Sequence, residues 1–117
     1  MNTEAWIEVP LHRVAHARTG DKGNRVNISL ICYSDGVYPH LVEQMTEARV
    51  LACFAHRRPS AVERFLLPNL GAINWVIDDV LGGGVNSSLF IDRHGKGLSS
   101  LLLAQTVRVP GHCVKAR

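Results

Sequence analysis

The strongest constraint on the fold is an alternating run that follows a charged, glycine-containing segment. In residues 26–33, VNISLICY, the even-numbered positions are apolar, while Asn27 and Ser29 are polar. A period of two is typical of a strand with one buried face. Residues 11–18 also have the pattern of a strand, and the five residues 20–24 separate it from the alternating run. The two runs therefore predict an antiparallel hairpin.

The rest of the chain predicts a mixed order of helices and strands. We expect a helix over 40–54, a short strand over 62–67, and a second helix capped by Asn69 that ends at Gly82–Gly84. The last third resembles a hairpin with arms 88–93 and 101–109, although SSLLLA (99–104) is equally compatible with a helical turn. This order favours an α+β, ferredoxin-like sandwich: a mostly antiparallel sheet of about five strands with two helices on one face. The uncovered face would carry polar side chains, namely those of His12, His16, Arg18, Asn27 and Ser29.

Length and composition limit the kind of protein. The 117 residues predict one domain over 1–117, with loose termini at about 1–8 and 111–117. The net charge is only +3 and the basic residues are scattered, which argues against nucleic acid as a partner. No apolar run approaches the ~18 residues of a membrane span. Three widely spaced cysteines and an N-terminus without the pattern of a signal peptide indicate a cytoplasmic protein.

Several residues that suggest a metal or cofactor site lack the required spacing. His12 and His16 would lie ~13 Å apart on a strand, so we expect no metal site and no cofactor. Cys32 alternates with core residues, which favours a packed thiol over a nucleophile. The glycines 82–84 follow a predicted helix, whereas a phosphate-binding loop precedes one. Asn86, just after these glycines, is retained as a candidate binding residue.

The segment around Gly-Asp-Lys-Gly-Asn is the strongest candidate site. As a tight turn, it needs only its glycine. As a site, its glycines would let backbone N–H groups converge on an anion, Lys22 would neutralise that anion, and Asp21 would act as a base or orient Lys22. Asp21 and Lys22 are therefore the candidate catalytic residues. The candidate binding residues of this segment are Arg18, Thr19, Gly20, Gly23 and Asn24.

Four segments together resemble a known family. HARTGDKGNRVNISL, YPHL, LPNLGAINWVIDDVLGGGVNSSLFIDRHGKGL and VRVP are similar to the small C-terminal domain of acyclic terpene utilisation (AtuA) proteins. The resemblance spans about residues 9–110, and Thr19 stands where serine is usual. It implies a ferredoxin-like fold and a setting in acyl-CoA and terpenoid-acid catabolism, and it implies that the small domain is made here as a separate chain.

The resemblance also implies a function and partners. We expect a small subunit or accessory domain of a two-part enzyme, which contributes the Gly-Asp-Lys-Gly-Asn loop to a shared site. Its partners would be a larger AtuA-like N-terminal-domain protein, a second copy of the chain, or both, and acyl-CoA is the ligand class suggested. Two alternatives stay open: a non-catalytic structural or oligomerisation module, and a free-standing small enzyme of unknown reaction. Whether the chain itself is an enzyme is therefore open.

Overall fold

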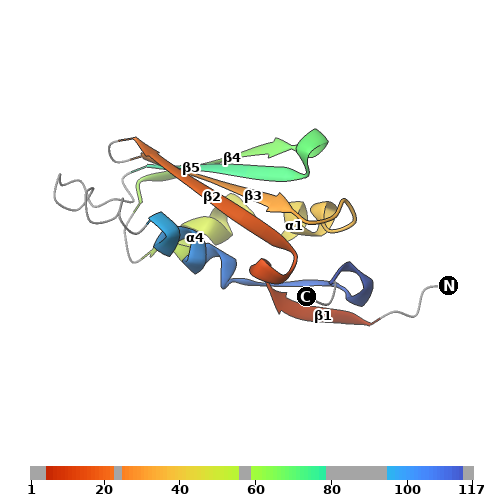
Figure 1. Ribbon diagram of the computed structural model, residues 1–117. Coiled ribbons are helices and arrows are strands. Elements are labelled where there is room, and N and C mark those ends of the chain that lie inside the picture. Colours follow the sequence, from red (N-terminus) through yellow and green to blue (C-terminus); the bar gives the residue numbers. More distant parts are fainter. Residues whose placement is uncertain (1–4, 23–24, 56–58, 79–94, 115–117) are drawn as a thin grey trace.

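The centre of the molecule is an antiparallel sheet of four strands in the order β2-β3-β5-β4 (Figure 1). The computed structural model describes residues 5–22, 25–55, 59–78 and 95–114, with side chains throughout except at 21, 22 and 95–97. The sheet strands are β2 (Ala15–Lys22), β3 (Arg25–Cys32), β4 (Ala61–Leu67) and β5 (Ala72–Asp78). The helices are α1 (Tyr38–Gln44), α2 (Glu47–Cys53) and α4 (Gly95–Leu103). A separate two-stranded ribbon pairs β1 (Trp6–Pro10) with β6 (Thr106–Pro110).

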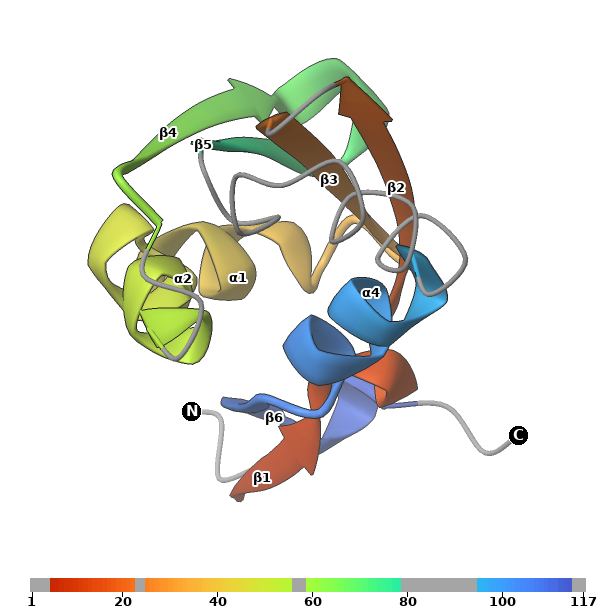
Figure 2. The same ribbon diagram turned by 90° about the vertical axis from the view of Figure 1, so that its left-hand side faces the viewer.

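The topology is that of a ferredoxin-like sandwich, as the sequence predicts. Between β3 and β4 the chain passes through α1 and α2, and β5 is inserted between these two strands and pairs with both. This is a split β-α-β unit. Helix α4 follows β5 and packs against β2, which precedes β3 in the sequence. The three α-helices of the described residues lie on one face of the sheet, and the β1–β6 ribbon lies beyond them (Figure 2).

The core forms between the sheet and the helices. From the sheet, alternate residues of β3 and β5 point inward, among them Ile28, Leu30 and Trp75, which are fully buried. From the helices, Leu41, Val50, Phe54 and Leu102 are also fully buried. Each large apolar side chain that leaves water stabilises the fold by about 1.5–3 kcal/mol. The covered face is therefore fixed by burial, and the opposite face of the four strands carries no helix among the described residues.

The predicted helix over 40–54 is wrong as a single element, because it breaks at Met45–Thr46. Thr46 begins α2 as its N-cap, since its Oγ1 accepts the Arg49 N–H at 3.1 Å. The end of α1 is held from the sheet: the Arg64 guanidinium donates to the carbonyl oxygens of Val42 at 2.7 Å and Met45 at 2.9 Å. Two short helices therefore replace one long helix, because side chains satisfy the backbone groups at the break.

The predicted helix after Asn69 is also wrong over the described residues. Asn69 lies in a short 3-10 helix (Pro68–Leu70) that joins β4 to β5, and Gly71 takes a left-handed φ of 59° at its end. Residues 72–78 form β5, whose inward positions have the period of two that a strand requires. Of the apolar residues that resembled a helical stripe, Ile73 and Ile77 are buried on the covered face, whereas Val76 is half-buried on the opposite face. The expected end of this helix, 79–84, lies outside the described residues.

The C-terminal third and the termini also differ from the expectation. Residues 95–103 are helical, which confirms the helical alternative for SSLLLA, and β6 pairs with β1. The other expected arm, 88–93, lies outside the described residues. The termini are less loose than expected, because residues 6–8 belong to β1 and Cys113 is buried in a 3-10 helix (Gly111–Cys113).

The first strand of the sheet also begins later than predicted. It starts at Ala15, because Leu11–Arg13 form a 3-10 turn and the Val14 N–H bonds to the Leu11 carbonyl oxygen at 2.9 Å. The strand also ends later than the predicted end at residue 18, because it continues through Gly20 to Lys22. The shift moves His12 out of the sheet and brings the beginning of the candidate loop into it.

Side chains form hydrogen bonds to the backbone at the exposed edges of two strands. The Glu47 carboxylate accepts the backbone N–H of Arg64 on β4 at 2.7 Å. The side-chain amide of Gln44 donates to the Arg108 carbonyl oxygen on β6 at 2.7 Å and accepts the Arg108 N–H at 2.8 Å. Such contacts block the addition of another strand at these positions. At Arg64 and Arg108 the strand edges are therefore closed to pairing, whereas the uncovered face of the sheet carries exposed side chains.

Candidate functional site

The candidate loop lies at the end of the β2–β3 hairpin. The register pairs Asp21 with Val26 and Lys22 with Arg25, so the hairpin expectation is confirmed. The turn itself is shorter than expected, because Asp21 and Lys22 belong to β2. Gly23 and Asn24, which the sequence places in the turn, lie outside the described residues, as does Asn86. Both candidate catalytic residues therefore lie at the last two positions of a strand.

Strand alternation divides the candidate binding residues between the two faces of the sheet. Arg18 and Gly20 are exposed and pair with Ser29 and Asn27 on the open face, which carries no helix. Thr19 pairs with the buried Ile28 on the face that packs against α4. Arg18 and Thr19 therefore cannot line the same side of a ligand, although they are adjacent in the sequence.

A hydroxyl pair joins the hairpin to α4. Thr19 Oγ1 and Ser99 Oγ are within hydrogen-bonding distance, and Ser99 is buried. Because α4 begins four residues before Ser99, its first turn lies at the same end of the molecule as the hairpin turn (Figure 1). Sequence reasoning missed Ser99, since residues 99–104 were left undecided between helix and strand. The contact fixes the covered side of the hairpin end.

An ion pair closes the sheet at the same end. Arg25 Nε donates to Asp78 Oδ1 at 2.6 Å, joining the start of β3 to the end of β5. The hydrogen bond to Asp78, and then the negative charge of that carboxylate, raise the pKa of Arg25. This pair was also missed, because Asp78 was expected in a helix. Three segments therefore meet here: the hairpin end, the end of β5 and the start of α4.

Gly20 is not explained by packing or by backbone conformation. A Cβ at this position would meet no atom of the described residues within 4 Å. Its φ is not in the left-handed region, where glycine is favoured. The missing side chain leaves room beside Asn27 on the open face, and a glycine in a strand often marks a place where a ligand or another chain approaches closely.

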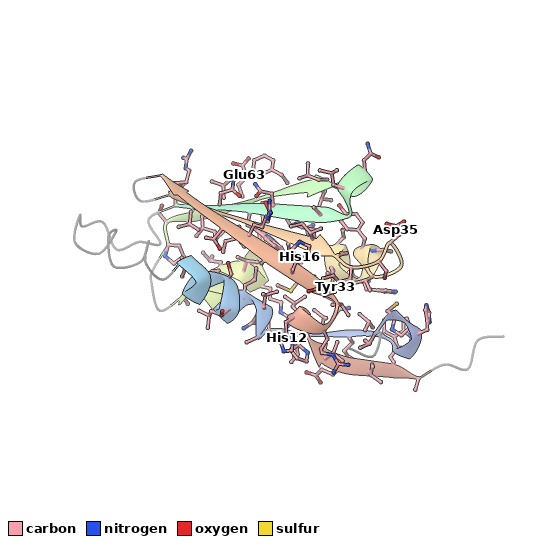
Figure 3. The ribbon with its side chains drawn as sticks, viewed as in Figure 1. His12, His16, Tyr33, Asp35 and Glu63 are labelled. Atoms are coloured by element: carbon pink, nitrogen blue, oxygen red, sulfur yellow. The ribbon has the colours of Figure 1, made fainter. Side chains whose placement is uncertain are left out.

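The open face bears out most of the polar positions expected from the sequence. His16, Arg18 and Asn27 are exposed there, and Ser29 Oγ donates to Asn74 Oδ1 at 2.9 Å. The ring of His16 stacks on Tyr33 with centroids 5.5 Å apart (Figure 3). His12 was expected on this face, but it belongs to the 3-10 turn Leu11–Arg13 instead.

The three cysteines lie on three different elements. Cys32 is on β3 and burial, with a smaller effect of the Asp35 charge, raises its pKa to about 11. Cys53 on α2 and Cys113 point their sulfur atoms at the carbonyl oxygens of Leu101 and Gly36, each at 3.9 Å. Within the described ranges, no group of three His, Cys, Asp or Glu side chains could hold a metal ion. Cys32 is thus a protonated, packed thiol at neutral pH.

The sheet topology and the polar hairpin end define a ferredoxin-like α+β domain with one candidate site at the loop end of its sheet. The family model of the AtuA ferredoxin-like domain matches residues 9–108, and the chain belongs to this family. Comparison with curated proteins and with solved structures gave no significant match. None of the helices in the described ranges is long and apolar enough to cross a membrane.

Proposed function

We propose that this chain is the small subunit or accessory domain of a two-part enzyme that acts on acyl-CoA thioesters in terpenoid-acid catabolism. A larger protein with the AtuA-like N-terminal domain supplies the rest of the site. The chain contributes Asp21, Lys22 and the following turn. Membership of the AtuA ferredoxin-like family supports the assignment to this kind of enzyme.

The observation that carries the proposal is the unexplained glycine at position 20. A turn that served folding alone would need glycine only where the backbone demands it, and Gly20 meets no such demand from the described residues. Next to it, the ion pair between Arg25 and Asp78 and the hydroxyl pair between Thr19 and Ser99 hold the hairpin end in place. These two contacts fix the backbone next to Gly20, and Gly20 itself has no side chain. Such a position suits the close approach of a ligand.

The test uses the complex with the larger AtuA-like protein. Branched acyl-CoA thioesters are incubated with the wild-type complex and with complexes that carry Asp21→Asn or Lys22→Ala, and products are followed by mass spectrometry. We expect both variants to assemble normally and to lose turnover on the order of a hundredfold, the usual contribution of a positioned acid or base. Glu43→Gln and Arg108→Ala change exposed charges on α1 and β6 and serve as controls.

The outcomes separate the three functions. Turnover by the chain alone would make it a free-standing enzyme. Normal turnover by both variants in the complex would remove the catalytic assignment and leave a structural module. The module is the second candidate function, and the open sheet face, which no helix of the described residues covers, is the observation that favours it.

A further inference from the structure

The open face of the sheet is ordered in rows across the four strands. The row farthest from the candidate loop is mostly apolar and consists of His16, Ile31, Ala72 and Leu67, with Tyr33 stacked on His16. The second row holds Arg18, Ser29, Asn74 and Phe65, and the third holds Gly20, Asn27, Val76 and Glu63. Phe65 and Leu67 are 43% and 39% exposed, although both are large and apolar. One end of this face is therefore apolar and the other is polar.

The two flanks of the face carry opposite charges. Arg18 is exposed on β2 and pairs with Ser29 on the open face. Glu63 is exposed on β4, on the side of the sheet away from the helices (Figure 3). Neither makes an ion pair with another described residue, although the pKa of Arg25, which is raised mainly by its pairing with Asp78, is also raised by the Glu63 charge. Arg18 and Glu63 lie one row apart, which is ~6.7 Å along the strands. The face thus has one positive flank and one negative flank at nearly the same level.

This pattern is complementary to itself. When two copies pack face to face about a two-fold axis parallel to the strands, β2 of one copy lies over β4 of the other, and equal rows oppose each other. Arg18 of each copy then lies within reach of Glu63 of the other, and the apolar rows meet. An axis perpendicular to the strands would instead place the apolar row over the row that holds Arg25 and Asp78. Sheets that pack face to face with strands nearly aligned are common.

We propose that the open face binds a second copy of this chain, with Arg18 of each copy paired with Glu63 of the other. Because the axis runs along the strands, both hairpin ends lie at the same end of the dimer. Gly20 lies inside the interface, opposite Glu63 of the other copy, so in this dimer a second copy occupies the room that the missing side chain leaves. The three rows and the next one, which holds Arg25 and Asp78, together cover ~500 Å² on each copy. The dimer therefore buries ~1,000 Å² in total, the lower limit of a specific interface. The inference depends only on the open face and not on the proposed catalytic role.

Sedimentation of the full chain between ~1 and ~300 µM tests the dimer, since an interface of this size implies micromolar affinity. Wild type should shift from monomer to dimer across this range. Arg18→Glu or Glu63→Arg alone places like charges together and should weaken association at least tenfold. An equimolar mixture of the two variants should dimerise again, because both contacts are then between opposite charges. Arg108→Glu on β6 is the control and should behave as wild type.

Circular dichroism establishes that each variant is folded. If a charge reversal prevents folding, Asn27→Glu, exposed on a central strand, replaces it and should also weaken the dimer at least tenfold, since it opposes Val76 of the other copy. A wild type that stays monomeric at ~300 µM, or a mixture that does not recover association, would overturn the proposal. Loss of binding to the larger AtuA-like protein in Arg18→Glu, with monomeric wild type, would also overturn it but leave the proposed function standing.

Discussion

Arg64 on β4 and Met45 at the end of α1 are joined by a hydrogen bond of 2.9 Å from guanidinium to carbonyl oxygen. The same guanidinium also reaches the Val42 carbonyl oxygen. One residue of the sheet therefore supplies the partners that the last turn of α1 lacks within the helix. Through this contact the edge strand determines where the helix ends.

Replacing Arg64 by alanine should lower the free energy of unfolding by about 2–3 kcal/mol, because hydrogen bonds that involve a charged group are among the stronger ones and the carbonyl groups are left without a partner. Urea unfolding measures the change. The slope of the unfolding free energy against urea concentration should stay the same. Arg108→Ala is the matched control, since the described contacts of Arg108 come from its backbone. Equal losses for the two variants would contradict the role given to Arg64.

Gln44→Ala should open the outer edge of β6. The side-chain amide makes two hydrogen bonds to the backbone of Arg108, and their loss should cost about 1–2 kcal/mol. Hydrogen exchange at the Arg108 amide should become faster, because that N–H loses its acceptor. Glu43→Ala changes the neighbouring exposed residue of α1 and should leave this amide protected. An unchanged exchange rate in Gln44→Ala would show that the edge is protected in another way.

A double-mutant cycle tests the hydroxyl pair between Thr19 and Ser99. Thr19→Val leaves the buried Ser99 hydroxyl without this partner and should cost about 1–2 kcal/mol. Adding Ser99→Ala removes the unpaired hydroxyl, so the double variant should be more stable than the sum of the single losses implies, by at least ~0.5 kcal/mol. Thermal or urea unfolding of the four proteins gives the coupling. Strict additivity would indicate that the hydroxyl groups do not interact.

Cys32 should make stability depend on pH above about pH 9. Burial raises its folded-state pKa from 9.0 to about 11. Below pH 9 the thiol is protonated in both states, so its contribution is complete. Between these two values the unfolded chain loses the proton and the folded chain keeps it, which favours unfolding as the pH rises.

The comparison of wild type with Cys32→Ala isolates this effect. Urea unfolding at about pH 8 and about pH 10.5 should show a smaller loss of stability in the variant, because other groups that ionise in this range are common to both proteins. Alkylation of Cys32 at about pH 8 should also be slow, since the thiolate is the reactive form. Equal losses in the two proteins would show that the Cys32 pKa is not raised by folding.

How far the sequence predicts the fold is clearest in the central strands. The alternation of 26–33 predicts β3 and its buried face, since period two follows from backbone geometry alone. The segment after Asn69 misleads, because Ile73, Val76 and Ile77 also satisfy a helical stripe. It becomes β5 because β3 and β4 pair with it on both sides. Pairing between distant segments leaves no local signal in the sequence.

The candidate site shows the same division. The sequence by itself determined the hairpin and the charged, glycine-containing composition of its end. The structure extends β2 past Arg18, which places Arg18 and Thr19 on opposite faces. Only the tertiary structure decided that Asp78 and Ser99 join the hairpin end, and that Arg64 breaks the predicted long helix. Local patterns depend on backbone period and turn chemistry, which neighbouring residues fix. These contacts join residues 53, 80 and 19 positions apart, and they exist only after the sheet and helices have packed.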